Sequence, residues 1–183
     1  QKYKAGTNTA VLEDLKRMET LATAPSMFAA LSAKVEPDVF MKTWRINSTI
    51  AKAAICMLAQ AQPRSFLTGA LVDLGTVMSA YNAREFHHVY PKAFLATQGI
   101  PFHQSNIIAN VCLLTSADNR SISDANPASY MARIPADQRD GIADGALIPR
   151  AMLDGSKTYA DFVKERAKRL SEAAQSLVTT GSL

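Results

Sequence analysis

The 183-residue chain has little of what defines several common protein classes. Its only cysteines, Cys56 and Cys112, stand in apolar runs, and no CxxC pair is present. Two cysteines are too few for a disulfide scaffold, so we expect two reduced core thiols in a cytoplasmic protein. A disulfide between them is an alternative without support in the sequence. No apolar run approaches the roughly 20 residues that a membrane span needs, so we expect no membrane partner.

The N-terminal residues also lack two features. The chain begins at Gln1 without an initiator Met, and residues 1–6 lack the apolar middle of a signal peptide. We therefore interpret the chain as a fragment, the C-terminal part of a larger protein. Hydrophobic residues make up 48% of the chain, enough for a buried core. The net charge of +4 permits a nucleic-acid partner without requiring one.

Helical periodicity dominates both ends of the chain. Apolar residues at intervals of three and four predict helices over 9–22, 26–36 and 37–62, with a turn at 64–69 that uses Gly69. The same spacing predicts an amphipathic helix over 159–177. Its basic residues are expected on the solvated face, with contact to a DNA backbone as the alternative: Lys164, Arg166, Lys168 and Arg169.

The central stretch 85–127 differs from both ends. It holds all three histidines and four asparagines: His87, His88, His103, Asn106, Asn110, Asn119 and Asn126. Imidazole and amide groups together suit a metal-assisted hydrolytic site, which needs a base for water and ligands for a cation. Adjacent strand residues point to opposite faces, so we expect His87 and His88 to divide these tasks.

The order of elements in this stretch is strand, loop, strand, helix. We predict strands near 86–90 and 111–115, a helical turn at 91–96, a loop at 98–101, a helix from about 117 and another helical turn at 127–131. Asn106 is interpreted as a helix or turn cap, with a structural role inside the loop as the alternative. A zinc site from His87, His103 and Cys112 has unsuitable spacing.

Two sequence segments carry a family resemblance. Residues 85–95 (EFHHVYPKAFL) and 110–120 (NVCLLTSADNR) resemble the two halves of an HNH (ββα-metal) nuclease motif, with a step of nine residues from one asparagine to the next. More narrowly, these segments together with SNIIAN (105–110), DNRSISD (118–124) and PASY (127–130) are similar to the C-terminal nuclease domain of GmrSD-type modification-dependent restriction enzymes and related phage-defence proteins. The similarity covers roughly residues 40–177.

The resemblance implies a role for each matching residue. His88 would be the general base and Asn110 would tie the loop that orients it. His87 and Asn119 would hold Mg²⁺ or Mn²⁺. Lys92 or Arg120 would contact phosphate. Because the chain lacks the cysteine pairs of the zinc-containing HNH subgroup, no structural zinc is expected.

The expected fold is mainly α, a helical domain with an embedded ββα-metal motif. Residues 1–80 would form a helical segment packed on the nuclease core, residues 81–135 the motif, and residues 136–183 a loop and the C-terminal helix, all within one compact domain. The expected function is DNA cleavage in anti-phage restriction. The alternative is a non-catalytic helical DNA-binding or interaction module with a vestigial motif.

The resemblance also implies partners. These are DNA, in particular modified phage DNA, and an N-terminal nucleotide-hydrolysing sensor domain outside this chain. A homo-oligomer is compatible with the sequence, since one such site cuts one strand.

Overall fold

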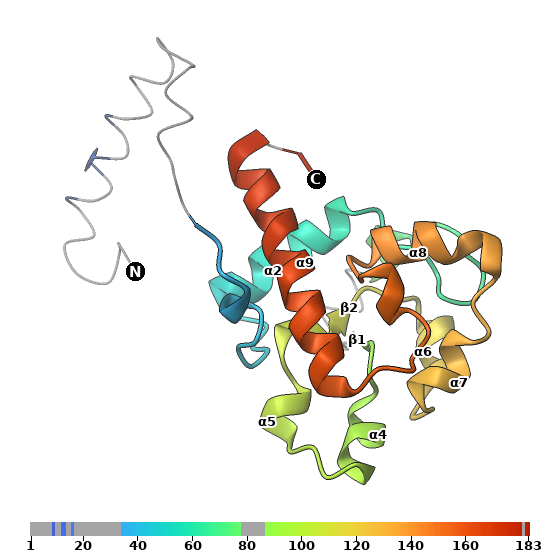
Figure 1. Cartoon of the computed structure of the whole chain (residues 1–183). Coiled ribbons are helices and arrows are strands. Elements are labelled where there is room, and N and C mark those ends of the chain that lie inside the picture. Colours follow the sequence, from blue (N-terminus) through green and yellow to red (C-terminus); the bar gives the residue numbers. More distant parts are fainter. Residues whose placement is uncertain (1–8, 10–11, 14–15, 17–33, 78–86, 181) are drawn as a thin grey trace.

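The computed structural model describes residues 9, 12–13, 16, 34–77, 87–180 and 182–183. It is mainly helical with a small two-stranded sheet near its centre (Figure 1). Most of the predicted helices 9–22 and 26–36 lies outside the described residues. The elements in chain order are η2 (Pro37–Val39), α2 (Thr49–Gln60), β1 (His87–His88), α4 (Lys92–Thr97), α5 (Phe102–Ser105), η3 (Ile108–Asn110), β2 (Val111–Cys112), α6 (Ser116–Ile122), α7 (Pro127–Met131), η4 (Ala136–Gln138), α8 (Arg139–Gly145), η5 (Arg150–Met152) and α9 (Tyr159–Thr180).

The single helix predicted over 37–62 is wrong. A short 3₁₀ turn, η2, is followed by turns and one isolated β-bridge, and α2 begins only after Ser48. Thr43 forms a β-bridge with Ile107, and the Trp44 amide donates to the Asn106 carbonyl at 2.8 Å. Because the backbone groups of these residues form hydrogen bonds with a distant loop, they cannot form the hydrogen bonds of a helix. The Ser48 hydroxyl then accepts from the Ala51 amide and caps α2.

The sheet has the predicted strand–strand–helix order. β1 and β2 run antiparallel, with His87 opposite Cys112 and His88 opposite Val111, and α6 follows β2. Each strand is shorter than predicted, with only two residues. One more backbone bond follows His88, from the Val89 amide to the Asn110 carbonyl at 2.8 Å. The Tyr90 amide then bonds the side chain of Asn110 instead of a backbone carbonyl, and the backbone pairing ends. The remaining apolar residues of the second run, Leu113 and Leu114, are buried beyond the strand.

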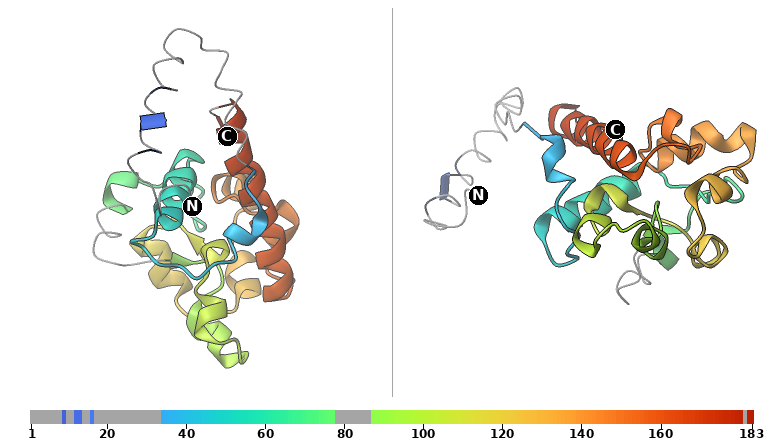
Figure 2. Two further views of the ribbon diagram at one scale, coloured as in Figure 1. Left: turned by 90° about the vertical axis from the view of Figure 1, so that its left-hand side faces the viewer. Right: turned by 60° about the horizontal axis from the view of Figure 1, so that its bottom comes forward.

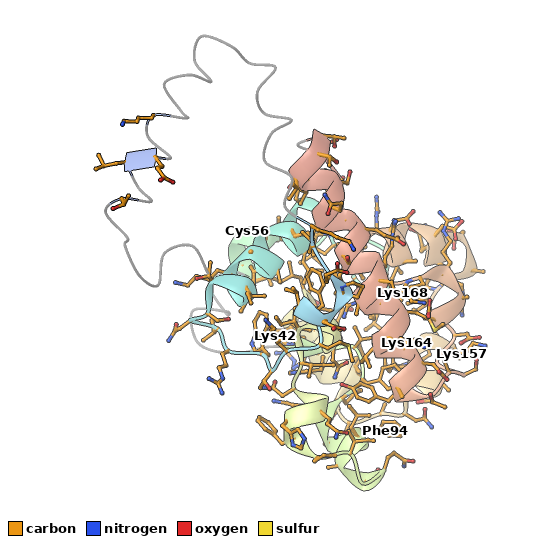
Figure 3. All side chains as sticks on the ribbon, turned by 60° about the vertical axis from the view of Figure 1, so that its left-hand side comes forward. Lys42, Cys56, Phe94, Lys157, Lys164 and Lys168 are labelled. Atoms are coloured by element: carbon orange, nitrogen blue, oxygen red, sulfur yellow. The ribbon has the colours of Figure 1, made fainter. Side chains whose placement is uncertain are left out.

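Helix α9 crosses the molecule and packs on η2 and η3 (Figures 1 and 2). Its inner face is apolar, as predicted, but it also includes Arg166, which is fully buried. The Arg166 guanidinium donates to the carbonyls of Ala109 at 3.0 Å and Ala146 at 2.9 Å. Hydrogen bonds of this kind offset the cost of removing a charge from water. The prediction that Arg166 lies on the solvated face is therefore wrong, whereas Lys164 and Lys168 are exposed (Figure 3).

Between β1 and β2 the chain makes an excursion through α4 and α5 that projects from the body (Figures 1 and 2). Tyrosine hydroxyls hold this excursion at both ends. Tyr130 on α7 donates to the Val89 carbonyl, and Tyr159 on α9 donates to the Gln104 carbonyl at 2.8 Å. The exit from β1 and the approach to β2 are thus fixed by helices that follow later in the chain.

The two cysteines have different environments. Cys112 is buried in β2, and burial raises the pKa of its thiol to about 12. Cys56 is exposed on α2 (Figure 3), so the prediction of a second core thiol is wrong. Both are free thiols, as expected. Among the described residues, no helix has the length and apolar character that crossing a membrane would require.

Thiol labelling tests this arrangement. At pH 8 the folded protein should react rapidly with a disulfide reagent at one thiol only, because the Cys112 thiol is shielded and stays protonated. Cys56→Ser should remove the rapid reaction, and denaturant should expose the second thiol. Two rapidly reacting thiols in the folded protein would contradict the buried position of Cys112.

Candidate functional site

His88 lies in β1 with only 8% of its surface exposed. Its Nε2 is 3.0 Å from Oδ1 of Asn106, and the amide nitrogen of Asn106 donates to the Trp44 carbonyl at 3.3 Å. The bond to Trp44 assigns the amide nitrogen of Asn106, so its oxygen faces the imidazole. Nε2 of His88 is then the donor, and a neutral ring carries its lone pair on Nδ1.

The side chain of Asn110 has no exposed surface and makes three hydrogen bonds. Its oxygen accepts from the Tyr90 amide at 2.8 Å, and its nitrogen donates to the carbonyls of Tyr90 and Ser105, both at 2.9 Å. The amide therefore exchanges both backbone bonds with Tyr90, as a peptide group on a neighbouring strand would. It extends the pairing of β1 and closes the loop that leads to Asn106.

His87 precedes His88 on the same strand and is 3% exposed. Directly opposed residues of an antiparallel pair share a face of the sheet, so His87 lies on the face of Cys112 and His88 on that of Val111. The two imidazoles are thus separated between the two faces, as the sequence predicts.

Asn119 and Arg120 are exposed on α6, while the neighbouring Asp118 is buried. The Asp118 carboxylate accepts from the hydroxyls of Ser65 at 2.8 Å and Thr115 at 3.0 Å. Thr115 in turn caps α6 by accepting from the Asp118 amide. These bonds fix the rotation of α6, and they leave the Asn119 amide accessible to solvent and solutes.

Lys92 is exposed at the start of α4, and its ammonium lies 5.4 Å from the ring centroid of Phe102. The structure therefore joins His88, Asn106 and Asn110 in one buried polar cluster. Lys92, Asn119 and Arg120 lie on the surface, outside that cluster.

Asn106 is the residue that sequence reasoning missed. Its backbone ends α5, as the cap interpretation predicts, but its side chain bonds His88 and Trp44. Only the alternative, a structural Asn inside the loop, anticipated this. The signal was the end of the polar run 103–106 directly before the apolar residues 107–109, all of which are buried.

The described residues contain no group of three or more His, Cys, Asp or Glu side chains placed to hold a metal ion. His103 lies on α5 and is exposed, whereas Cys112 is buried in β2. A hard cation such as Mg²⁺ needs fewer protein ligands, prefers oxygen ligands and keeps several waters, so an exposed amide oxygen suits it better than an imidazole.

Comparison with models of protein families gives no match, and neither curated proteins nor solved structures give one. The functional argument therefore depends on the residues and their geometry.

Two identical substitutions test the different positions of Asn110 and Asn119. Asn110→Asp removes the two amide hydrogens and leaves the carbonyls of Tyr90 and Ser105 facing a carboxylate, so it should lower the free energy of unfolding by about 3 kcal/mol. Asn119→Asp on the exposed face of α6 should change it by less than about 0.5 kcal/mol. Urea unfolding measures both, and equal effects would contradict the assigned environments.

Proposed function

We propose that this chain is a metal-dependent DNA endonuclease domain. The observation that carries the proposal is the ββα order itself. His88 lies in the first strand and bonds the buried side-chain amide of Asn106. Asn119 is exposed on the helix that follows the second strand. The spacing of these residues resembles the HNH motif, and the element order is the one that motif requires.

In the proposed reaction His88 is the general base. The bond from its Nε2 to Asn106 sets the ring orientation and the tautomer, so Nδ1 takes the proton of the attacking water. The imidazolium that forms still donates from Nε2 to the Asn106 oxygen, which stabilises its charge. Asn110 acts through the loop, since it holds the segment that carries Asn106.

His87 and Asn119 would hold Mg²⁺ or Mn²⁺. Of this donor set, Asn119 offers the neutral amide oxygen that a hard cation prefers, on an accessible face of α6. His87 would add a softer imidazole nitrogen from the strand that carries the base. The bound cation would supply positive charge to the phosphate and the leaving oxygen. Lys92 and Arg120, both exposed, would contact neighbouring phosphates.

The resemblance to GmrSD-type proteins supports the biological setting that we propose. In that setting the domain is the effector of a cytoplasmic restriction protein and cuts modified phage DNA under control of an N-terminal nucleotide-hydrolysing sensor. Because one site cuts one strand, double-strand cleavage would need two protomers or two successive events.

One observation favours the alternative, a non-catalytic DNA-binding module. Both histidines are largely buried, at 3% and 8% exposure. A base must reach its water, so catalysis requires an opening on the Nδ1 side of His88, whereas binding alone does not.

Relaxation of supercoiled plasmid separates the two functions. The protein with Mg²⁺ or Mn²⁺ should produce open circles, and EDTA should stop the reaction. His88→Gln keeps a donor for Asn106 but removes the base, so it should lower the rate by about 10²-fold or more. A thermal melt shows whether each variant is folded.

Variants of Asn119 provide the control for the metal. Asn119→Ala should abolish cleavage, while Asn119→Asp, which retains an oxygen ligand at an exposed position, should retain it. Full cleavage by folded Asn119→Ala would contradict the ligand assignment. Metal-dependent cleavage that persists in His88→Gln would contradict the base.

A further inference from the structure

Acidic residues are unevenly distributed along this chain. Residues 39–72 and 87–117 contain no Asp or Glu, and nine of the 16 acidic residues fall in 118–183. The bridge between Thr43 and Ile107 brings the two acid-free segments together. One face of the molecule is therefore built from the 41–45 loop and from α4 and α5, with no carboxylate of its own.

The basic residues of this face have no carboxylate partner in the part of the chain that the structure describes. Among the described residues, Lys42, Arg45 and Lys92 are exposed and form no ion pair with a carboxylate. Several positive charges elsewhere are paired: Arg150 with Asp140 and Asp144 at 3.0 and 3.1 Å, and Lys168 with Glu165 at 2.7 Å. Lys164 on α9 is exposed and forms no ion pair among the described residues. Lys42, labelled in Figure 3, Arg45 and Lys92 can therefore meet a polyanion without competition from a carboxylate of their own segments.

A large aromatic ring stands among these charges. Phe102, at the start of α5, is 65% exposed, the highest exposure of any large hydrophobic residue in the described part of the chain. The Lys92 ammonium lies over its ring. An exposed ring beside a cation resembles the surfaces on which proteins stack nucleobases while a basic side chain meets the phosphate.

A cavity of about 600 Å³ opens on the same face, between the 41–43 loop, α5 and the first turn of α9. Its lining combines apolar and hydrogen-bonding groups, among them Lys42, Thr43, His103, Gln104, Ile107 and Tyr159. Its size lies in the range of small-ligand sites. Ile107 lines this cavity and directly follows Asn106, the partner of His88, so the cavity adjoins the candidate catalytic cluster.

We propose that this face binds a single-stranded stretch of DNA. Phe102 stacks on one base, Lys42, Arg45 and Lys92 neutralise phosphates, and the cavity accepts a neighbouring nucleotide. Single-stranded DNA fits better than a duplex, because only an unpaired base offers its flat face to the Phe102 ring. The inference rests on the proposed function in that nucleic acid is taken as the substrate.

Fluorescence anisotropy with labelled oligothymidylate of about 20 nucleotides tests this, with EDTA present so that no cleavage occurs. The protein should bind this strand more tightly than a duplex of equal length. Phe102→Leu keeps an apolar side chain at an exposed position and should weaken binding by about tenfold. Lys42→Gln should weaken binding severalfold and reduce its salt dependence.

Lys168→Gln is the matched control, because it removes an equal charge that is already paired with Glu165, and it should leave binding unchanged. Unchanged binding by Phe102→Leu, or an equal effect of Lys168→Gln and Lys42→Gln, would overturn the inference. Heparin bound as tightly as DNA, without dependence on Phe102, would show a general polyanion surface and would also overturn it.

The outcome is separable from that of the nuclease assay. Cleavage that needs His88, together with unaltered binding by Phe102→Leu, would refute the binding surface alone. Binding that depends on Phe102, with no cleavage in any metal, would support the surface and refute the nuclease.

Discussion

The architecture of the site depends on one buried amide. The side chain of Asn110 bonds the backbone of Tyr90 as a peptide group would, and it also donates to the carbonyl of Ser105. These bonds close the segment from Tyr90 to Asn110 into a loop. The Arg166 guanidinium on α9 supports this loop, because it donates to the carbonyl of Ala109, the residue before Asn110. A carboxylate could not replace this amide, because both carbonyls need a donor. The excursion through α4 and α5, the Asn106 side chain and hence the orientation of His88 all follow from that closure.

The same closure separates two kinds of surface. Inside the loop the polar groups are paired and buried, which suits the orientation of a single imidazole. On the molecular surface, the segment through α4 and α5 exposes Lys92 and Phe102, and α6 exposes Asn119 and Arg120. A hydrolytic site needs both: a rigid base that is partly withdrawn from water, and accessible groups that meet a charged substrate. The arrangement therefore has the two components that the proposed reaction requires, on elements that are fixed by separate contacts.

Much of this organisation could be predicted from the sequence. Local patterns predict α4, α6, α7 and α9 and the order of strands, because each has its own periodicity, cap or proline signal. The predictions failed where distant backbone groups decide the structure. Trp44 and Thr43 break a helical pattern because their partners are Asn106 and Ile107. Arg166 is buried because two carbonyls from other elements meet it, and Asn106 bonds an imidazole rather than its own helix. No local signal specifies such long-range partners.

Paramagnetic Mn²⁺ gives the most direct test of the central claim, that His87, His88 and Asn119 form a cation-dependent hydrolytic site. Nitrogen-detected NMR of the side chains should show neutral His88 protonated on Nε2. Substoichiometric Mn²⁺ should broaden the side-chain signals of His87 and Asn119 before those of His103, and Asn119→Ala should remove that selectivity. Broadening of His103 first, or equal broadening in the Asn119→Ala variant, would contradict the account.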